Sequence, residues 1–286
     1  MSKPLSILYF GTPRFSVFVL EALVTAGYAP TAVVTTPDRP AGRGLAVTQS
    51  PIKEWSLEHS LSVIQPESLK KSSPELDLIK NSEWDLFVVA GYGKILPKEL
   101  VDLPRLGALN VHPSLLPRFR GPSPIESQIL GDEREVGVTI LLMDDQMDHG
   151  PIVAQARITP DPWPVKTTTL EDILWAEGGS LLVEVLPDFI AGTITPEPQD
   201  HEKATTTTFM KKEDGHLDPK ADPYKNYLKY CAYDEWPGTY FVVERLGKTI
   251  RVKVNEAKYE NGEFTILRVT PEGKREMSYE DYLRAG

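Results

Sequence analysis

The chain has 286 residues, of which 41% are hydrophobic and 25% charged, which is the composition of an ordinary globular protein of roughly two domains. Its formal net charge of −10 argues against a general nucleic-acid binder, because affinity for phosphate backbones comes mainly from Lys and Arg. The charge is uneven, since residues 1–199 carry 16 basic and 25 acidic side chains and residues 200–286 carry 15 and 16. Relative to the rest of the chain, the C-terminal third is the part that a polyanion could contact.

Cysteine usage and the apolar runs argue against two further classes. The single cysteine, Cys231, cannot form an internal disulfide, and no Cys/His cluster has the spacing of metal ligands, so we expect no metal site. The apolar run at residues 7–10 is cut by glycine and proline and is too short for a signal peptide or a membrane span. We expect a cytoplasmic, monomeric protein that does not contact a membrane.

Short apolar runs rich in β-branched residues alternate with helical patterns over the first two thirds of the chain. Between the first two runs, Phe15, Phe18 and Ala22 recur at the spacing of a helix that Gly27 ends. The pattern predicts βαβ units, and so an α/β, Rossmann-like domain with a largely parallel sheet. The turn at Gly11 lacks the G-x-G-x-x-G pattern, so it does not predict a nucleotide cofactor. The predicted strands cover residues 6–10, 31–36, 61–64, 85–91, 108–111 and 137–143.

The last third of the chain has a different pattern. A long helix is predicted over residues 167–190, and the segment after it is rich in Pro, Thr and charge. We interpret residues 193–207 as a linker between a first domain at 1–192 and a second at 208–286. The second domain is predicted to be a small, OB-like β-barrel with one helix. Its helix is expected at residues 222–233, and strands at 248–257, 263–269 and 274–277.

The most reactive side chains lie at the end of the predicted strand 108–111. Asn110 and His112 are two residues apart, so in a strand they project from the same face and place an amide donor beside an imidazole. Polar residues at the carboxyl end of a strand are where open α/β sheets bind ligands. Four prolines stiffen the loop that follows, which suits a wall that holds a substrate in one geometry.

An imidazole that transfers protons commonly pairs with a carboxylate, and three acids follow the predicted strand 137–143. On spacing alone any of the three could reach His112, and the acids could equally be solvated loop residues with His112 as the cap of its strand. His149, in the same loop, is a competing imidazole. The three candidate acids are Asp144, Asp145 and Asp148.

The stretch NVHPSLLPRFRGPSPI (110–125), followed by MDDQMDHGPIV (143–153), resembles a paired signature of the formyltransferases that use 10-formyltetrahydrofolate. The signature consists of N-x-H, then S-L-L-P, and then a strand-end Asp shortly before Gly. The resemblance implies a catalytic triad of Asn110, His112 and Asp148, and so selects the third of the three acids.

Other segments, spread along nearly the whole chain, resemble the methionyl-tRNA formyltransferases within this superfamily. Residues 35–53, with PDRPAGRG, are similar to the loop that these enzymes insert after the second strand, and residues 90–100 to their next sheet segment. KKEDGHLD (211–218) and WPGTY (236–240) resemble their junction between linker and barrel. The chain departs from the family in two ways: His149 stands where a threonine or small residue is usual, and the C-terminal β-domain looks shortened.

The resemblance implies transfer of a formyl group from 10-formyltetrahydrofolate, a co-substrate, to the α-amine of methionyl initiator tRNA. His112 would exchange protons, Asp148 would hold the imidazole, and Asn110 would donate to the developing oxyanion. The folate would contact two segments, through Ser114, Leu115, Leu116 and Pro117 and through Val89, Gly91, Tyr92 and Ile95. The tRNA would contact basic residues, namely Arg39, Arg43, Lys53, Arg251 and Lys253.

Three other functions are consistent with parts of the pattern. A formyltransferase acting on a nucleotide-linked amino sugar shares N-x-H and the Asp, although the PDRPAGRG loop argues against it. A folate-binding or RNA-binding relative without catalysis would not need Asn110, His112 and Asp148 intact. A hydrolase of the formylated folate would use water in place of the amine, but such hydrolases usually carry an extra regulatory domain, and we expect none here.

Overall fold

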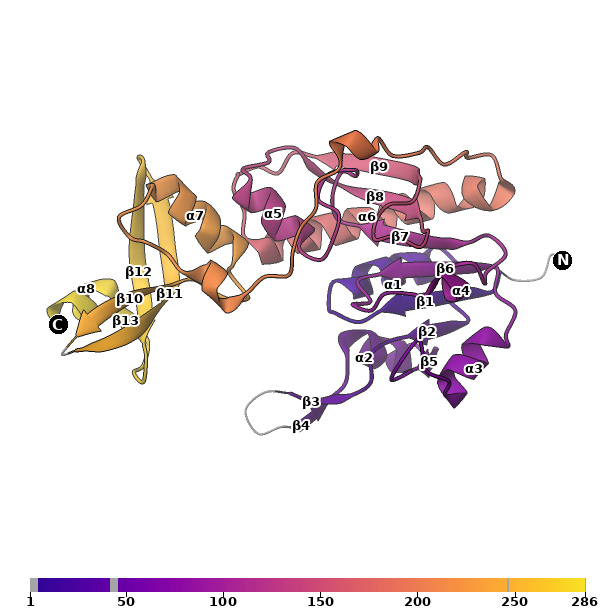
Figure 1. Ribbon diagram of the computed structural model, residues 1–286, viewed down its shortest axis with the longest axis horizontal. Coiled ribbons are helices and arrows are strands. Elements are labelled where there is room, and N and C mark those ends of the chain that lie inside the picture. The colour runs from indigo at the N-terminus through magenta and orange to yellow at the C-terminus, as the bar shows by residue number, and fades with distance from the viewer. Residues whose placement is uncertain (1–4, 42–45, 246, 286) are drawn as a thin grey trace. The chain divides into compact units, whose positions relative to one another are not determined.

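The computed structural model describes residues 5–41, 46–245 and 247–285. The chain divides into two compact units, which are described separately below (Figure 1). The first unit comprises the residues up to Gly121 together with 137–157 and 171–206, and the second comprises 122–136, 158–170 and 207 onward.

The predicted fold class is confirmed. One unit is built on a mainly parallel, seven-stranded sheet flanked by helices, and the other contains a four-stranded antiparallel sheet. The predicted domain boundaries, with the first domain ending at residue 192 and the second beginning at residue 208, remain a prediction.

Seven strands form the sheet of the first unit, in the order β5-β2-β1-β6-β7-β8-β9. They are β1 (Ile7–Gly11), β2 (Ala32–Val34), β5 (Ser62–Ile64), β6 (Leu86–Ala90), β7 (Ala108–His112), β8 (Val136–Leu142) and β9 (Ile152–Ile158). The pairs from β5 to β7 are parallel, whereas β7 and β8 are antiparallel. The chain moves from β1 outward to β2 and β5 and then returns to the other side of β1 at β6. Ligands in open α/β sheets bind beyond the carboxyl ends of the strands at such a reversal, and here that edge carries Gly91 and His112.

Every strand predicted for this region is present, and the helices follow recognisable start signals. Ser50 caps α2, Ser73 caps α3 and Asp222 caps α7, and in each case proline occupies the first helical position. The helices are α1 (Ser16–Thr25), α2 (Pro51–Glu58), α3 (Pro74–Lys80), α4 (Lys98–Val101), α5 (Pro124–Leu130), α6 (Thr167–Ala191), α7 (Pro223–Ala232) and α8 (Tyr279–Arg284). Two 3-10 turns cover His201–Lys203 and Lys212–Gly215, and a hairpin is formed by β3 (Arg39–Ala41) and β4 (Ala46–Thr48).

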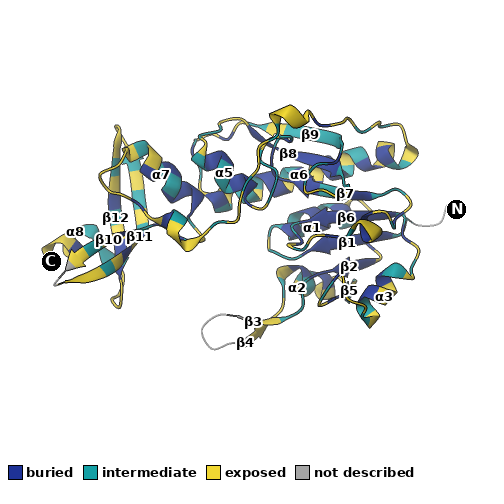
Figure 2. Cartoon of the chain, viewed as in Figure 1, coloured by how far each residue is buried: buried dark blue, intermediate teal, exposed yellow. Residues whose placement is uncertain are grey.

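Both faces of the parallel sheet are buried, as the dark strands of Figure 2 show. Leu8 and Phe10 of β1 belong to a core cluster that includes Leu76 of α3. Tyr9 points to the opposite face, where its hydroxyl donates a hydrogen bond of 2.6 Å to the carbonyl of Ser16 in α1. Because strands covered on both faces need apolar side chains at every position, these segments read as continuous apolar runs.

Two adjacent glycines allow α6 to pack closely behind the strand that ends at His112. A Cβ atom at Gly178 would lie 2.6 Å from Val111 of β7, and one at Gly179 would lie 3.1 Å from the carbonyl oxygen of Phe18 in α1. The first distance is shorter than real Cβ contacts, so Gly178 is required for this approach, whereas at Gly179 an added Cβ would need its neighbours to move by a few tenths of an ångström. The packing fixes β7 from behind.

The second unit contains an antiparallel sheet in the order β10-β11-β12-β13, with α7 packed on β11 and β12. Its strands are β10 (Tyr240–Arg245), β11 (Lys248–Glu260), β12 (Glu263–Pro271) and β13 (Met277–Ser278). Val252 and Val254 are buried, whereas Arg251 and Lys253, which alternate with them along the strand, are exposed. This part of β11 therefore has one apolar and one basic face.

Candidate active site

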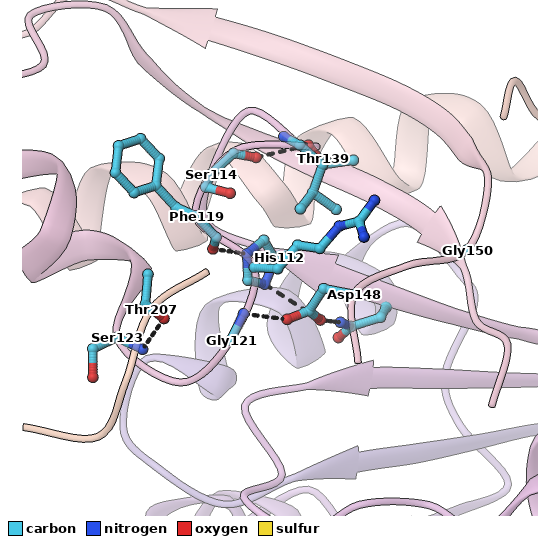
Figure 3. A network of polar contacts seen from close by, with 12 residues as sticks. His112, Ser114, Phe119, Gly121, Ser123, Thr139, Asp148, Gly150 and Thr207 are labelled. Atoms are coloured by element: carbon cyan, nitrogen blue, oxygen red, sulfur yellow. Dashed lines mark hydrogen bonds and ion pairs between the residues drawn. The ribbon is translucent and has the colours of Figure 1, made fainter. Parts of the chain in front are cut away.

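The site lies in the first unit, where β7 ends. In the sheet, Asn110 is paired with Val89 of β6 on one side, and His112 is paired with Thr139 of β8 on the other. The side chains of Asn110 and His112 both reach Asp148, so they share a face as their spacing predicts (Figure 3). The pairing of β6 with β7 brings the 89–96 segment beside this face.

The imidazole of His112 is buried, with 4% of the residue exposed, and each ring nitrogen has a defined neighbour. Nε2 lies 2.9 Å from the carbonyl oxygen of Phe119, and because a carbonyl oxygen only accepts, Nε2 carries the proton. The lone pair of the neutral ring is therefore on Nδ1, which faces Oδ1 of Asp148 at 3.6 Å. A proton taken up by Nδ1 would point at this carboxylate, and such contacts often shorten only when substrate is bound.

Asp148 is held in a defined direction by the backbone and by a neighbouring side chain. Its φ angle is +51°, a left-handed conformation that is uncommon for residues other than glycine. Its Oδ2 accepts a hydrogen bond of 2.8 Å from the backbone N–H of Gly121, and its Oδ1 accepts one of 3.2 Å from Nδ2 of Asn110 (Figure 3). These two donors orient the carboxylate so that Oδ1 is presented to His112.

The other acids of the same loop lie elsewhere. Asp145 is exposed, and Asp144 accepts a hydrogen bond of 2.6 Å from Nδ1 of His149. The ring of His149 also stacks on that of His201, with the centroids 4.2 Å apart. Of the three candidate acids, the structure thus places Asp148 beside His112, and it gives the competing imidazole a partner of its own.

A family model described as formyl transferase matches residues 5–186 of the chain. The methionyl-tRNA formyltransferase of Methylococcus capsulatus (strain ATCC 33009 / NCIMB 11132 / Bath) is 36% identical over 302 aligned positions, which cover 98% of this chain and 96% of that protein. The chain belongs to the methionyl-tRNA formyltransferase family. The resemblance stated from the sequence motifs is therefore confirmed.

Two more comparisons describe how this family member relates to known proteins. The methionyl-tRNA formyltransferase of Chloroflexus aurantiacus (strain ATCC 29366 / DSM 635 / J-10-fl) is 45% identical over 234 residues, 82% of this chain and 75% of that protein. A solved structure of an N-formyltransferase from Helicobacter canadensis, in complex with folinic acid and dTDP-3-aminofucose, shares the fold with a TM-score of 0.65 at 16% identity. That match covers 92% of this chain and 95% of the other. The alignment with the Methylococcus relative is longer than the 286 residues present here, so this family member lacks residues which that relative has.

The S-L-L-P loop of the formyltransferase motif (114–117) is hydrogen-bonded to β8. The hydroxyl of Ser114 donates to the carbonyl of Arg118 at 2.7 Å, so the loop itself uses this hydroxyl. Leu116 is 3% exposed, and its N–H donates to Oγ1 of Thr139 at 3.1 Å. Leu115 lies so close to Gly137 that a Cβ there would meet it at 2.5 Å. The leucines therefore form a packed apolar wall, and Pro117, half-buried, continues it.

The second predicted folate segment places its four residues differently. Val89 is 7% exposed and is paired with Asn110, whereas Ile95 is 70% exposed. The ring of Tyr92 packs edge-on against Phe10 at 5.4 Å, and burial raises the pKa of its hydroxyl. Since the Tyr92 ring points into the core, a ligand at this position would meet the backbone. The backbone is also constrained at Gly91, where φ is +63°.

The predicted tRNA-contacting residues fall into two groups, one in each unit. Arg39 is exposed at the start of β3, and Arg43 lies outside the described residues. The ammonium of Lys53 is 2.6 Å from Asp38, and this hydrogen bond lowers the pKa of the aspartate.

The second group of basic residues lies on β11. The guanidinium of Arg251 lies over the ring of Tyr240, 3.6 Å from its centroid, and Lys253 is exposed on the same strand. An exposed Arg that rests on an aromatic ring is held ready for a phosphate or a base.

Sequence reasoning missed the polar residues that hold the loops of the site. Thr139 also donates to the carbonyl of Ser114 at 2.7 Å, and Gln155 donates to the carbonyl of Leu116 at 2.8 Å. Gln199 donates to the carbonyl of Asp148 at 2.9 Å although it belongs to the predicted linker. A threonine within the otherwise apolar strand β8 was a usable signal, whereas nothing in a Pro/Thr-rich segment indicates a buried glutamine.

Three further features of the described residues concern metals, the thiol and membranes. Within residues 5–41, 46–245 and 247–285, no group of three or more His, Cys, Asp or Glu side chains has an arrangement that could hold a metal ion. Cys231 is buried, and burial raises the pKa of its thiol to about 11, which makes it an inert apolar group. No helix in the described part of the chain is both long and apolar enough to cross a membrane.

Proposed function

We propose that the chain transfers the formyl group of 10-formyltetrahydrofolate to the α-amine of methionyl initiator tRNA, as a monomer in the cytoplasm. The observation that carries the proposal is the buried imidazole of His112, whose protonated Nε2 is fixed by Phe119 and whose Nδ1 faces Asp148. The membership of the chain in the methionyl-tRNA formyltransferase family supports the choice of substrate.

In the proposed reaction each of the three polar side chains has its own task. The amine nitrogen attacks the formyl carbon, and its proton passes to Nδ1 of His112, where the imidazolium is stabilised by Asp148. Asn110 uses one of its two amide hydrogens for Asp148, so the second can donate to the oxyanion of the tetrahedral intermediate. The bond between the formyl carbon and N10 then breaks, and His112 returns the proton to N10. Loss of an oxyanion donor typically costs on the order of a hundredfold or more in rate.

In this proposal the formyl donor binds beside Asn110, where the pairing of β6 with β7 brings the 89–96 segment. The wall formed by Leu115, Leu116 and Pro117 supplies apolar surface, and the 89–96 segment supplies backbone groups next to Asn110. Pterin binding needs this combination, because ligand pockets are mostly apolar and carry a few polar groups that fix orientation. The solved neighbour that holds folinic acid is consistent with a folate at this fold's active site.

The tRNA would contact Arg39, Arg43 and Lys53 on one unit and Arg251 and Lys253 on the other. Of these, Arg39 and Arg251 are the best supported, because Arg39 is exposed and Arg251 is exposed and stacked, whereas the charge of Lys53 is paired with Asp38. Each phosphate contact contributes a salt-dependent term to binding.

The salt dependence of tRNA binding tests this assignment. A variant with Arg39→Ala and Arg43→Ala should bind tRNA more weakly, and the slope of log K against log salt should become shallower by about 0.7–0.9 for each phosphate that is no longer neutralised. Folate binding should not change. Lys98→Ala is the matched control, since the ammonium of Lys98 pairs with Asp102 in the same unit. An unchanged slope in the double variant would remove both arginines from the interface.

The proposed activity is tested by a transfer assay with three acceptors. Charged initiator tRNA should be formylated, charged elongator methionine tRNA much less, and a nucleotide-linked amino sugar not at all. His112→Ala should fold normally and lose transfer by several orders of magnitude, about 10³-fold or more, as with other residues of a catalytic triad. Formylation of the amino sugar in preference to the tRNA would favour the rival formyltransferase, and normal turnover by His112→Ala would remove the assigned mechanism.

A further inference from the structure

Gln199 is a buried side chain whose hydrogen-bonding groups are all used beside the proposed active site. It is 5% exposed, and its Nε2 donates to the carbonyls of Asp148 at 2.9 Å and Gly150 at 2.7 Å. Its Oε1 accepts from Nε and Nη2 of Arg120, at 3.1 Å and 2.6 Å. An amide has two hydrogens and two acceptor sites, so this one is saturated. Gln199 thus bridges the Asp148 turn and the loop that carries Arg120.

The same segment, residues 197–206, which we call the strap, also holds the other partner of His112. Oγ1 of Thr205 accepts a hydrogen bond of 2.8 Å from the N–H of Phe119, and the carbonyl of Thr205 accepts one of 2.9 Å from the N–H of Arg120. Phe119 is the residue whose carbonyl accepts from Nε2 of His112. The strap therefore contacts the residues on both sides of the imidazole, Gln199 on the Nδ1 side and Thr205 on the Nε2 side.

Both partners of the imidazole have backbones that need such support. Asp148 has φ of +51° and Phe119 has φ of +61°, and residues other than glycine keep these conformations only when their surroundings fix them. The direction of the Asp148 carboxylate and of the Phe119 carbonyl depends on these two backbone angles. Release of either turn would leave a ring nitrogen of His112 without its partner.

We propose that Gln199 and Thr205 are positioning residues, through which the strap fixes the tautomer and the orientation of His112 for formyl transfer. The inference rests on the proposed function. Neither residue touches the reacting atoms: Gln199 acts through Asp148, and Thr205 acts through Phe119. Two residues of the segment that the sequence presents as a linker thereby help to position His112.

A purely architectural role for the strap predicts a different outcome. Glu197 pairs with Ile152 on β9, and this contact alone would serve to cover the edge of the sheet. If covering that edge were its only purpose, disturbing Gln199 would lower stability and would leave the chemistry of the folded molecules unchanged. Positioning predicts instead a loss of kcat in folded protein.

The first test is Gln199→Glu, which keeps the size of the side chain and its acceptor for Arg120 but removes the two donors to the carbonyls of Asp148 and Gly150. We expect kcat to fall by about tenfold to a hundredfold, the cost typical of a displaced catalytic group, with the KM of both substrates nearly unchanged. Thr205→Val should cause a smaller fall of the same kind. The matched controls are Gln146→Glu in the same loop and Thr206→Val in the strap, both exposed in the wild type, and they should leave kcat unchanged.

A double-variant cycle separates positioning from general damage. If Gln199 acts through Asp148, adding Gln199→Glu to Asp148→Asn should cost little beyond Asp148→Asn alone. Losses that multiply would overturn the inference, and so would a kcat of Gln199→Glu equal to that of the wild type.

A spectroscopic measurement tests the strap without any substrate. In protein labelled with ¹⁵N-histidine, His112 should show one protonated Nε2 in the wild type, and both strap variants should shift its signals toward a mixture of tautomers. If the ¹⁵N signals of His112 are the same in both strap variants as in the wild type, the strap does not position His112, even if the wild type transfers the formyl group normally. If the wild type fails to formylate methionyl-tRNA, the proposed function fails, while the tautomer result still decides whether the strap orients the ring.

Discussion

Two histidine–aspartate pairs lie close together in the chain. The pair with the shorter distance is the more exposed of the two. His149 and Asp144 are 2.6 Å apart, with side chains 27% and 32% exposed. His112 and Asp148 are 3.6 Å apart, with side chains 6% and 11% exposed. The closer pair is thus the one that water reaches, and the wider pair is the one that resembles a catalytic site.

The difference shows that fixed neighbours are a better guide to a site than the length of one contact. An exposed ion pair contributes about 0–1 kcal/mol, because water screens the charges and the side chains lose freedom. A buried carboxylate acts on its neighbour through a lower effective dielectric, so it remains effective at a longer distance. Asp148 also accepts hydrogen bonds from Gly121 and Asn110, which prevent it from turning away from His112.

The largest effect is expected where the buried pair loses its charge. Asp148→Asn keeps the shape of the side chain but can place an amide N–H against Nδ1 of His112, the atom that must take the proton. We expect kcat for formyl transfer to fall by about 10³-fold to 10⁴-fold, as when the aspartate of a catalytic triad is neutralised. Single-turnover rates with charged initiator tRNA measure the loss, and urea unfolding confirms that the variant is folded. Turnover close to the wild-type value would show that burial does not identify His112 and Asp148 as the catalytic pair.

The substitution Gly150→Ala should displace the turn that carries Asp148 while leaving the side chain of Asp148 itself intact. A Cβ atom at Gly150 would lie 1.9 Å from the carbonyl oxygen of Leu142, so Gly150→Ala must displace backbone. We expect unfolding free energy to fall by about 1–3 kcal/mol, as for other overpacked sites, and kcat to fall at least tenfold because Asp148 moves from His112. Urea titration and the transfer assay measure the two effects.

Gly27→Ala is the comparison for that variant. Gly27 has φ of +85° and nothing within 4 Å of the added Cβ, so alanine there costs only the backbone strain of a left-handed conformation, about 1–2 kcal/mol. Its kcat should stay at the wild-type value. Equal losses of kcat in the two alanine variants would mean that lower stability, and not the position of Asp148, limits the reaction.

Much of the fold could be predicted, because strands buried on both faces leave continuous apolar runs in the sequence. β1, β6 and β8 were predicted in this way. β9 was not found, since its residues are almost all half-buried and its sequence, IVAQARI, has no clean period. The antiparallel placement of β8 beside β7 depends on tertiary packing and leaves no local pattern.

The site could be predicted only where its geometry is local. The common face of Asn110 and His112 follows from the period of two in a strand. The choice of Asp148 needed the family resemblance, because three acids within five residues are equivalent on spacing. The carbonyl of Phe119 and the amide of Gln199 could not be found, since a backbone acceptor has no sequence signal and Gln199 reaches the site only through the tertiary fold.

The smallest effect is expected at the half-buried pair of His149 and Asp144, which water reaches. His149→Ala removes both the bond to Asp144 and the ring that stacks on His201. Because a pair that water reaches contributes about 0–1 kcal/mol, the free energy of unfolding should change by no more than that. Activity should fall slightly more than in Asp144→Asn, since Nδ1 of His201 accepts a hydrogen bond of 2.9 Å from Arg120, which in turn holds Gln199. Urea titrations, with kcat for both variants, test this order. A loss in His149→Ala as large as that in Asp148→Asn would place the pair of His149 and Asp144 in the chemistry and would overturn the distinction drawn from burial.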